Sequence, residues 1–338
     1  MTADVPGLDL PRLHEYFTDR VPGYSGSLQA SLLPGGRSNL TYRLDDGRTS
    51  WVLRRPPLGT LTPSAHDVGR EYRIMAALGQ TGVPVPETIA LHEATDVLGV
   101  PFSLVSYVHG RTLRTRGDLA KLAPQAVRDS AHELVDVLAR LHQVDYRQVG
   151  LADAGRPDGY LRRQVRRWRD QWSRVATREL PDIDTLHDRL TATVPEYSAA
   201  AIVHGDVRID NAIFAHDDQS SIKALIDWEM ATIGDPLADV GLMLVYRDPV
   251  VDLVLGHASA ATSDAMPSPD ELAEQYVRAS GRDLSRLDFY VALGYFKLAV
   301  IAEGIHERFT AGLTVGEGFD RVGEAVPALL ATGLVAGS

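Results

Sequence analysis

The sequence predicts an α+β protein with a small, antiparallel β-rich N-terminal lobe and a larger, mainly helical C-terminal lobe. At 338 residues the chain exceeds the usual size of a single hydrophobic core. Short apolar runs separated by Gly- and Asp-rich turns dominate up to residue 108, and apolar residues at helical spacing dominate afterwards. We therefore expect lobes at residues 1–108 and 109–338, with the active site in the cleft between them.

The N-terminal lobe is predicted from a hairpin followed by a helix. In residues 41–54, TYRL and SWVLR flank the turn sequence DDG, which is typical of two antiparallel strands. Apolar residues recur near helical spacing in HDVGREYRIMAAL (66–78), so we expect a helix there. GVPVPETIAL is punctuated by prolines and should be extended, and VPFSLVSYV (100–108) should form a strand.

The C-terminal lobe is predicted from a 3.6-residue periodicity. Apolar stripes run through residues 127–141, through LRRQVRRWRDQWSRV (161–175) and through about 287–309. SPDELAEQYV places Ser, Pro and Glu as in a capping box, so a helix should begin at residue 269. The small-residue segment 256–269 is expected to be disordered.

Composition narrows the possible function classes. The net charge of -11 disfavours non-specific binding to nucleic acid. The absence of cysteine excludes disulfides, thiolate metal sites and cysteine nucleophiles. The N-terminal stretch does not read as a signal peptide, and no window holds eighteen uninterrupted apolar residues. We expect a cytoplasmic protein that binds neither nucleic acid nor a membrane.

Polar residues are concentrated in HGDVRIDN (204–211) and LIDWE (225–229), each beside an apolar, strand-like segment. Asp206, Asn211 and Asp227 offer oxygen atoms from these loops. Oxygen-rich ligation suits Mg²⁺, which binds one or two carboxylates together with substrate phosphates. The pattern therefore indicates phosphoryl transfer.

In this chain an Asp is followed five residues later by Asn, and a further Asp follows a hydrophobic hairpin. This arrangement resembles the motif of the aminoglycoside phosphotransferase and choline kinase group, whose fold is protein-kinase-like. The resemblance extends over about residues 28–309. The segments SNLTYRL, VLRRPP, AHDVGREYRIM, VPVP, HGDVRIDN, DWEMATIGDPLADVG and FKLAVIAEGI look like the subgroup related to kinase domains fused to some acyl-CoA dehydrogenases. The resemblance implies an ATP-dependent kinase that acts on a small molecule. It implies a hydroxyacyl-CoA or hydroxy-acid substrate as strongly as it implies an antibiotic.

The resemblance also implies roles for the residues of the C-terminal motifs. Asp206 would be the catalytic base that accepts the proton of the substrate hydroxyl. Arg208 would offset charge on the transferred phosphoryl group. Asn211 and Asp227 would hold Mg²⁺ against the ATP phosphates. Asp235 and Asp239, in GDPLADVG, are expected to brace the catalytic loop through its backbone.

In the N-terminal lobe, the resemblance places Arg54 where related enzymes carry a phosphate-binding lysine, and Glu71 where they carry its ion-pair partner. The neighbouring Arg55 could compete for the role of Arg54.

Two further segments of this lobe are implied to bind nucleotide. The loop PGGRSN, with Ser38 and Asn39, would cover the phosphates. The segment SYV would bind adenine through the backbone of Ser106 and Val108.

The helix predicted at 161–175 is rich in arginine. Its Trp and Leu stripe explains its amphipathicity, so a solvated basic face is expected. The resemblance to acyl-CoA-related kinases motivates a second hypothesis, in which part of this face contacts a substrate phosphate. The arginines are Arg162, Arg163, Arg166, Arg167, Arg169 and Arg174.

Other interpretations stay open. Asp and Asn favour turns, although turn chemistry does not explain the joint spacing of the three polar residues. The chain could be a nucleotide-binding module without catalytic activity, or a metal-dependent hydrolase that uses the same carboxylates. No GxxxxGK[ST] sequence occurs, so a P-loop is not supported. The substrate, the choice between ATP and GTP, and the oligomeric state are not determined by the sequence.

Overall fold

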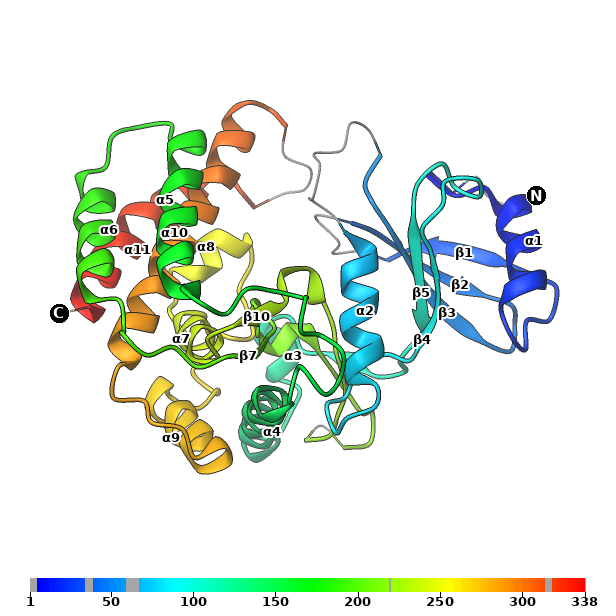
Figure 1. Cartoon of the computed structure of the whole chain (residues 1–338), viewed down its shortest axis with the longest axis horizontal. Coiled ribbons are helices and arrows are strands. Elements are labelled where there is room, and N and C mark those ends of the chain that lie inside the picture. Colours follow the sequence, from blue (N-terminus) through cyan, green and yellow to red (C-terminus); the bar gives the residue numbers. More distant parts are fainter. Residues whose placement is uncertain (1–4, 34–38, 59–66, 219, 314–317, 338) are drawn as a thin grey trace. The chain divides into compact units, whose positions relative to one another are not determined.

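The computed structural model describes residues 5–337 except 34–38, 59–66, 219 and 314–317. The chain divides into two compact units (Figure 1). The first unit comprises residues 1–109 and 224–229, and the second comprises 110–223 and 230–338. The sequence predicted two uninterrupted spans; in the structure, a short segment around Asp227 returns to the first unit.

The first unit is built on a five-stranded antiparallel sheet in the order β1-β2-β3-β5-β4. The predicted hairpin forms β2 and β3, and Asp46 orders its turn by accepting hydrogen bonds from the backbone N–H groups of Arg48 and Thr49. The strands are β1 (Gln29–Leu32), β2 (Leu40–Asp45), β3 (Ser50–Arg55), β4 (Thr88–His92) and β5 (Phe102–Ser106).

Two helices cover the opposite faces of this sheet (Figure 1). Helix α1 (Leu10–Arg20) begins at the N-cap Asp9 and buries Leu13 and Phe17 against the aromatic face of β2 and β3. Burying such a side chain stabilises the fold by roughly 1.5–3 kcal/mol. Helix α2 (Val68–Leu78) contacts β4 and β5, and it carries Glu71 to the side of the sheet onto which Arg54 projects.

The second unit is mainly helical. Its central helix, α10, packs against α11, α7, α5 and α6. By length and composition α10 could cross a membrane, but 72% of its apolar window is buried inside the structure, as expected for a core helix. The helices are α3 (Arg116–Leu119), α4 (Pro124–Gln143), α5 (Tyr160–Val175), α6 (Pro181–Thr193), α7 (Leu237–Val245), α8 (Val251–Leu255), α9 (Pro269–Ser280), α10 (Leu287–Thr310) and α11 (Val322–Ala336).

Short strands of the second unit hold its polar loop at both ends. β7 (Ala201–Val203) pairs antiparallel with β10 (Thr232–Gly234), and β8 (Ala212–Phe214) pairs antiparallel with β6 (Arg111–Thr112). The sequence HGDVRIDN connects β7 to β8 through a 3₁₀ turn at Ile209–Asn211. The following strand β9 (Ile222–Leu225) leads the chain into the segment that belongs to the first unit.

The prediction of disorder for residues 256–269 was wrong. Ser259, Ala260 and Thr262 are almost fully buried. The Thr262 hydroxyl donates to Asp252 at 2.7 Å, and the Arg247 guanidinium donates to the carbonyl of Ala261. The small side chains allow this segment to pack closely, and contacts with residues outside it supply the order that its composition does not.

Candidate active site

The loop after β7 has a backbone conformation that requires glycine. Gly205 has φ +84°, in the left-handed region. A Cβ atom at this position would lie 2.8 Å from the carbonyl oxygen of Met230. Glycine therefore allows the chain to turn tightly between His204 and Asp206.

The Asp206 carboxylate is held from three sides within the second unit. The Tyr246 hydroxyl donates to its Oδ1 atom at 2.5 Å, and the Asn211 amide donates to its Oδ2 atom at 3.0 Å. Nε of Arg208 lies 3.4 Å from the same Oδ2. The structure thus brings together the predicted base, its neighbouring arginine and one predicted metal ligand.

The electrostatic surroundings keep Asp206 ionised. Burial works to raise the pKa of its carboxyl, but the charge of Arg208, the hydrogen bond from Tyr246 and the charge of Lys297 together lower this pKa below its ordinary value. A carboxylate in this state can accept a proton, as a catalytic base must.

Asp239, at the start of α7, holds the backbone of the loop that carries Asp206. Its two carboxylate oxygens accept hydrogen bonds from the backbone N–H groups of His204 at 2.6 Å and Gly205 at 2.7 Å. The predicted bracing role of Asp239 is confirmed. Asp235 does not have the predicted bracing contacts. Its carboxylate accepts hydrogen bonds from the backbone N–H of Leu237 and from the hydroxyls of Ser198 and Tyr290, which lie outside the loop 204–211.

Lys297 on α10 supports the same loop. Its ammonium group donates to the carbonyl oxygen of Gly205 at 2.7 Å and lies 5.7 Å from the ring centre of Trp168. Burial lowers the pKa of Lys297, while the charges of Asp206 and Asp239 act in the opposite direction. A buried cation beside the base helps to stabilise its ionised form.

Asn211 is 7% exposed and uses its amide nitrogen for hydrogen bonds to the backbone and side chain of Asp206. Within the described part of the chain, no hydrogen bond uses its amide oxygen. That oxygen is chemically suited to a hard cation such as Mg²⁺.

The first unit contains a second charged cluster, centred on Arg54. Nη1 of Arg54 lies 2.9 Å from Glu71 Oε2, and Nη2 lies 3.6 Å from Asp227 Oδ1. Glu229 also lies within 3.8 Å of this guanidinium. The structure therefore joins the predicted arginine, its predicted ion-pair partner and a predicted metal ligand.

Arg54 and Arg55 lie on opposite faces of the sheet because side chains alternate along β3. Arg54 faces Glu71, whereas Arg55 points to the other face of the sheet. There Arg55 is buried, 6% exposed, and donates to the carbonyls of Pro56 and Gly7. Arg55 thus lies apart from the carboxylate cluster.

The carboxyl group of Glu71 has a raised pKa in this cluster. Burial raises the pKa of its carboxyl to about 7, although the charge of Arg54 acts to lower it. Asp227 and Glu229 raise it further through repulsion between like charges.

Asp227 has φ +69°, the one positive φ found at a non-glycine position among the described residues. Such a conformation is uncommon for a side chain that is not glycine, and it often marks a functional position. No sequence pattern predicted this backbone strain.

The other described residues predicted to bind nucleotide lie outside the cluster of Arg54, Glu71 and Asp227, or only support it. Ser38 lies outside the described residues. Asn39 is 1% exposed, and its amide donates to Glu71 at 3.0 Å, so it supports the ion pair. The backbone N–H of Ser106 is already bonded to the carbonyl of Glu87, whereas the backbone of Val108 forms no hydrogen bond with the other described residues.

Tyr246 and Lys297 were not assigned a role from the sequence. Tyr246 is the C-cap residue of α7 and follows the apolar run LMLV, and Lys297 lies within the mainly apolar α10. Tyr246 belongs to none of the motifs quoted above, whereas Lys297 lies in the segment FKLAVIAEGI, which the resemblance includes without giving the lysine a role.

Comparisons with known proteins agree with these features. Residues 29–290 match the model of the phosphotransferase enzyme family. Acyl-CoA dehydrogenase family member 11 is 35% identical in Gallus gallus and 32% identical in Homo sapiens, in each case over 96% of this chain. The chain spans 43% of the length of these relatives.

Solved structures show the same fold. The crystal structure of a "putative aminoglycoside phosphotransferase" from Ralstonia eutropha is 30% identical, with a TM-score of 0.84 and coverage of 97% of this chain and 98% of that one. An aminoglycoside phosphotransferase in complex with AMP-PNP and hygromycin B is 18% identical, with a TM-score of 0.63 and coverage of 96% and 98%. The chain belongs to the phosphotransferase enzyme family and has its α+β, protein-kinase-like fold.

Proposed function

We propose that this phosphotransferase uses ATP and Mg²⁺ to phosphorylate a hydroxyl group of a small molecule. The observation that carries this proposal is the environment of Asp206. Its carboxylate is ionised, lies on a loop fixed by Asp239 and Lys297, and contacts Arg208 and Asn211. A fixed base beside a cation and an amide ligand is suited to the transfer of a phosphoryl group.

The proposed roles follow from the chemistry of each side chain. Asp206 orients the acceptor hydroxyl and takes its proton, and Arg208 offsets negative charge on the transferred group. Asn211 and Asp227 would hold Mg²⁺, since an amide oxygen and a carboxylate combined with phosphate oxygens are a donor set that this ion favours. When bound, Mg²⁺ would neutralise charge on the nucleotide phosphates.

The proposed nucleotide contacts lie in the first unit. Arg54, positioned by its ion pair with Glu71, would bind the ATP phosphates, as the ion pair between these residues supports. Val108 would bind adenine through its backbone groups, which no other described residue engages, and Ser106 would use its carbonyl, since its N–H is bonded to Glu87. Asn39 would act indirectly, by holding Glu71.

For the acceptor we propose a hydroxyacyl-CoA or a related hydroxy acid. The support is the similarity over nearly the whole chain to acyl-CoA dehydrogenase family members. We also propose a cytoplasmic location, with which a chain without cysteine is compatible.

A screen for ATP consumption tests this function. ADP release is measured with Mg²⁺ and a panel of acceptors that contains hydroxyacyl-CoA thioesters, free hydroxy acids, choline and aminoglycosides. We expect ADP release that depends on one class of acceptor. An ATP-dependent thermal shift without turnover on any acceptor would instead support a catalytically inactive nucleotide-binding module.

A further inference from the structure

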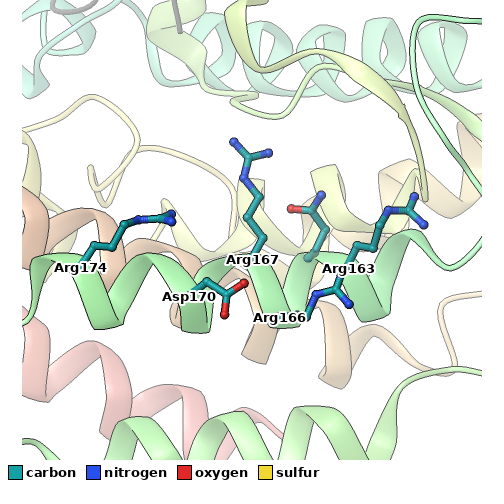
Figure 2. Close-up of a pocket in the computed structure, with 6 residues that line it drawn as sticks. Arg163, Arg166, Arg167, Asp170 and Arg174 are labelled. Atoms are coloured by element: carbon teal, nitrogen blue, oxygen red, sulfur yellow. The ribbon is translucent and has the colours of Figure 1, made fainter. Parts of the chain in front are cut away.

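One face of α5 surrounds an open pocket of about 360 Å³ with arginines (Figure 2). In Figure 2 the guanidinium groups of Arg163, Arg167 and Arg174 lie on the same side of the helix. We call this set the α5 arginine face; it is lined by Arg163, Gln164, Arg166, Arg167, Asp170 and Arg174. Four arginines against one aspartate make this face basic, in a chain whose net charge is -11.

The arginines of this face are not neutralised by carboxylates of the described residues. Arg169, on the same helix but outside the pocket, pairs with Asp184 at 2.6 Å. By contrast, among the described residues none of the four pocket arginines forms an ion pair with a carboxylate. Arg163 donates to backbone carbonyls, and Arg174 donates to the Gln171 side chain.

Grouping like charges one helical turn apart without carboxylate partners destabilises a helix by a few tenths of a kcal/mol per pair. A solvated face explains the exposure of Arg166, Arg167 and Arg174, but it does not require four arginines to line one pocket. Guanidinium groups that no carboxylate neutralises are well suited to bind phosphate or carboxylate oxygens through paired, charge-assisted hydrogen bonds.

Helix α5 is linked through Trp168 to the loop of the same unit that carries Asp206. Trp168 follows Arg167 in α5, and its ring lies 5.7 Å from the Lys297 ammonium group. That ammonium group in turn donates to the carbonyl oxygen of Gly205, the residue before Asp206. Arg167 is close enough to Lys297 for its charge to lower the pKa of the lysine, in addition to the larger effect of burial.

We propose that the α5 arginine face binds an acidic group, a phosphate or a carboxylate, of the acceptor substrate whose hydroxyl is phosphorylated at Asp206. This inference rests on the proposed function and names its substrate class. The acceptor is an organic anion. An aminoglycoside, which carries several protonated amines, would be repelled by a face with four arginines.

The test measures binding by isothermal titration calorimetry, with Mg²⁺ and AMP-PNP present so that the nucleotide site is occupied. The probes are coenzyme A, pantetheine, 3-hydroxybutyrate and kanamycin. Coenzyme A compared with pantetheine reports on phosphate, 3-hydroxybutyrate reports on carboxylate, and kanamycin is the polycation. The variants are Arg167→Gln and Arg174→Gln, with Arg162→Gln as the matched control, since Arg162 is exposed on α5 outside the pocket.

We expect coenzyme A or 3-hydroxybutyrate to bind, and Kd to rise roughly tenfold in each pocket variant through loss of charge-assisted hydrogen bonds. Arg162→Gln should bind as the wild type does, and kanamycin should not bind. The inference is overturned if neither anion binds, if Arg162→Gln weakens binding as much as the pocket variants, or if kanamycin binds in their place.

This experiment separates the inference from the proposed function, because it needs no turnover. If an anion binds through these arginines but the protein transfers no phosphate, the α5 site is supported and the kinase function is contradicted. If Arg167→Gln phosphorylates a neutral or cationic acceptor at the wild-type rate, the kinase function is supported and the α5 site is contradicted.

Discussion

Tyr246 donates a hydrogen bond of 2.5 Å to the carboxylate of Asp206, although 40 residues separate them in the sequence. The carboxylate that we propose as the base is therefore oriented by α7 as well as by its own loop. Burial and the neighbouring charge of Asp206 raise the pKa of Tyr246 well above its ordinary value, so this hydroxyl keeps its proton and acts as a donor.

Tyr246→Phe should shift the pH dependence of catalysis. The Tyr246 hydrogen bond lowers the pKa of Asp206, so its loss should raise this pKa. Because the ionised form is the base, the acidic limb of kcat/KM should move to higher pH by up to about one unit, the equivalent of one hydrogen bond. A profile measured from pH 4 to pH 9 tests this. A lower rate with an unmoved acidic limb would limit Tyr246 to a packing role.

Glu71→Gln should change how stability depends on pH. The pKa of Glu71 is raised from 4.5 to about 7 in the folded protein. The folded state therefore binds this proton more tightly, and the contribution of Glu71 to the free energy of unfolding is lost as pH rises from about 4.5 to about 7. In the variant this loss is absent. Relative to wild type, its free energy of unfolding should rise between pH 5 and pH 8 by on the order of 1–3 kcal/mol.

Urea unfolding at the two pH values measures this difference. Glu93→Gln is the control, because the side chain of Glu93 is 71% exposed and pairs with Arg73 at the surface. Its stability relative to wild type should be the same at both pH values. A constant difference for Glu71→Gln as well would mean that Glu71 titrates normally.

Arg54→Ala and Arg55→Ala should have different effects although the residues are adjacent. Arg54 faces the carboxylate cluster, so its removal should raise KM for ATP about tenfold or more through loss of a charged phosphate contact. Arg55 bonds to backbone carbonyls on the other face, so its removal should lower stability by about 1–3 kcal/mol and leave KM for ATP unchanged. Steady-state kinetics and urea unfolding decide the matter, and a reversal of the two effects would move the nucleotide contact to Arg55.

Gly205→Ala should disrupt the catalytic loop. The new methyl group would meet the backbone of Met230 at 2.8 Å, in addition to the cost of a positive φ. We expect a loss of stability of roughly 2–4 kcal/mol and a large fall in kcat. Gly150→Ala is the matched control, because Gly150 has φ +79° and nothing within 4 Å of the added Cβ atom. Thermal melting of both variants separates the steric effect from the conformational one, and equal losses would exclude the steric effect.

The predictable part of the fold is the part with local periodicity. The hairpin β2–β3 and the helices α2, α4, α5, α9 and α10 follow apolar spacing or capping signals in the sequence. Helix α11 was missed because AVPALLATGLVA is apolar almost all round and has no polar face. Residues 256–269 were misjudged because their order comes from Arg247 and Asp252, which lie outside the segment.

In the candidate site, too, the residues with a local sequence pattern were predictable and those that reach the site from distant segments were not. Asp206, Asn211 and Asp227 could be identified because their spacing is local and specific. Tyr246 and Lys297 could not, because they reach the catalytic loop from 40 and 92 residues away. The α5 arginines were visible as a basic run, but only the structure shows that four of them line one pocket and lack carboxylate partners among the described residues.

The central claim is that Asp206 serves as the base for transfer of the γ-phosphoryl group of ATP to an acceptor hydroxyl. The most direct test follows the acceptor by ³¹P NMR and compares kcat for wild type and Asp206→Asn, with AMP-PNP affinity measured in parallel. We predict one phosphate monoester formed per ADP in the wild type, a fall in kcat of about 10²- to 10⁴-fold in the variant, and little change in nucleotide affinity. Near-wild-type turnover by Asp206→Asn would contradict the claim.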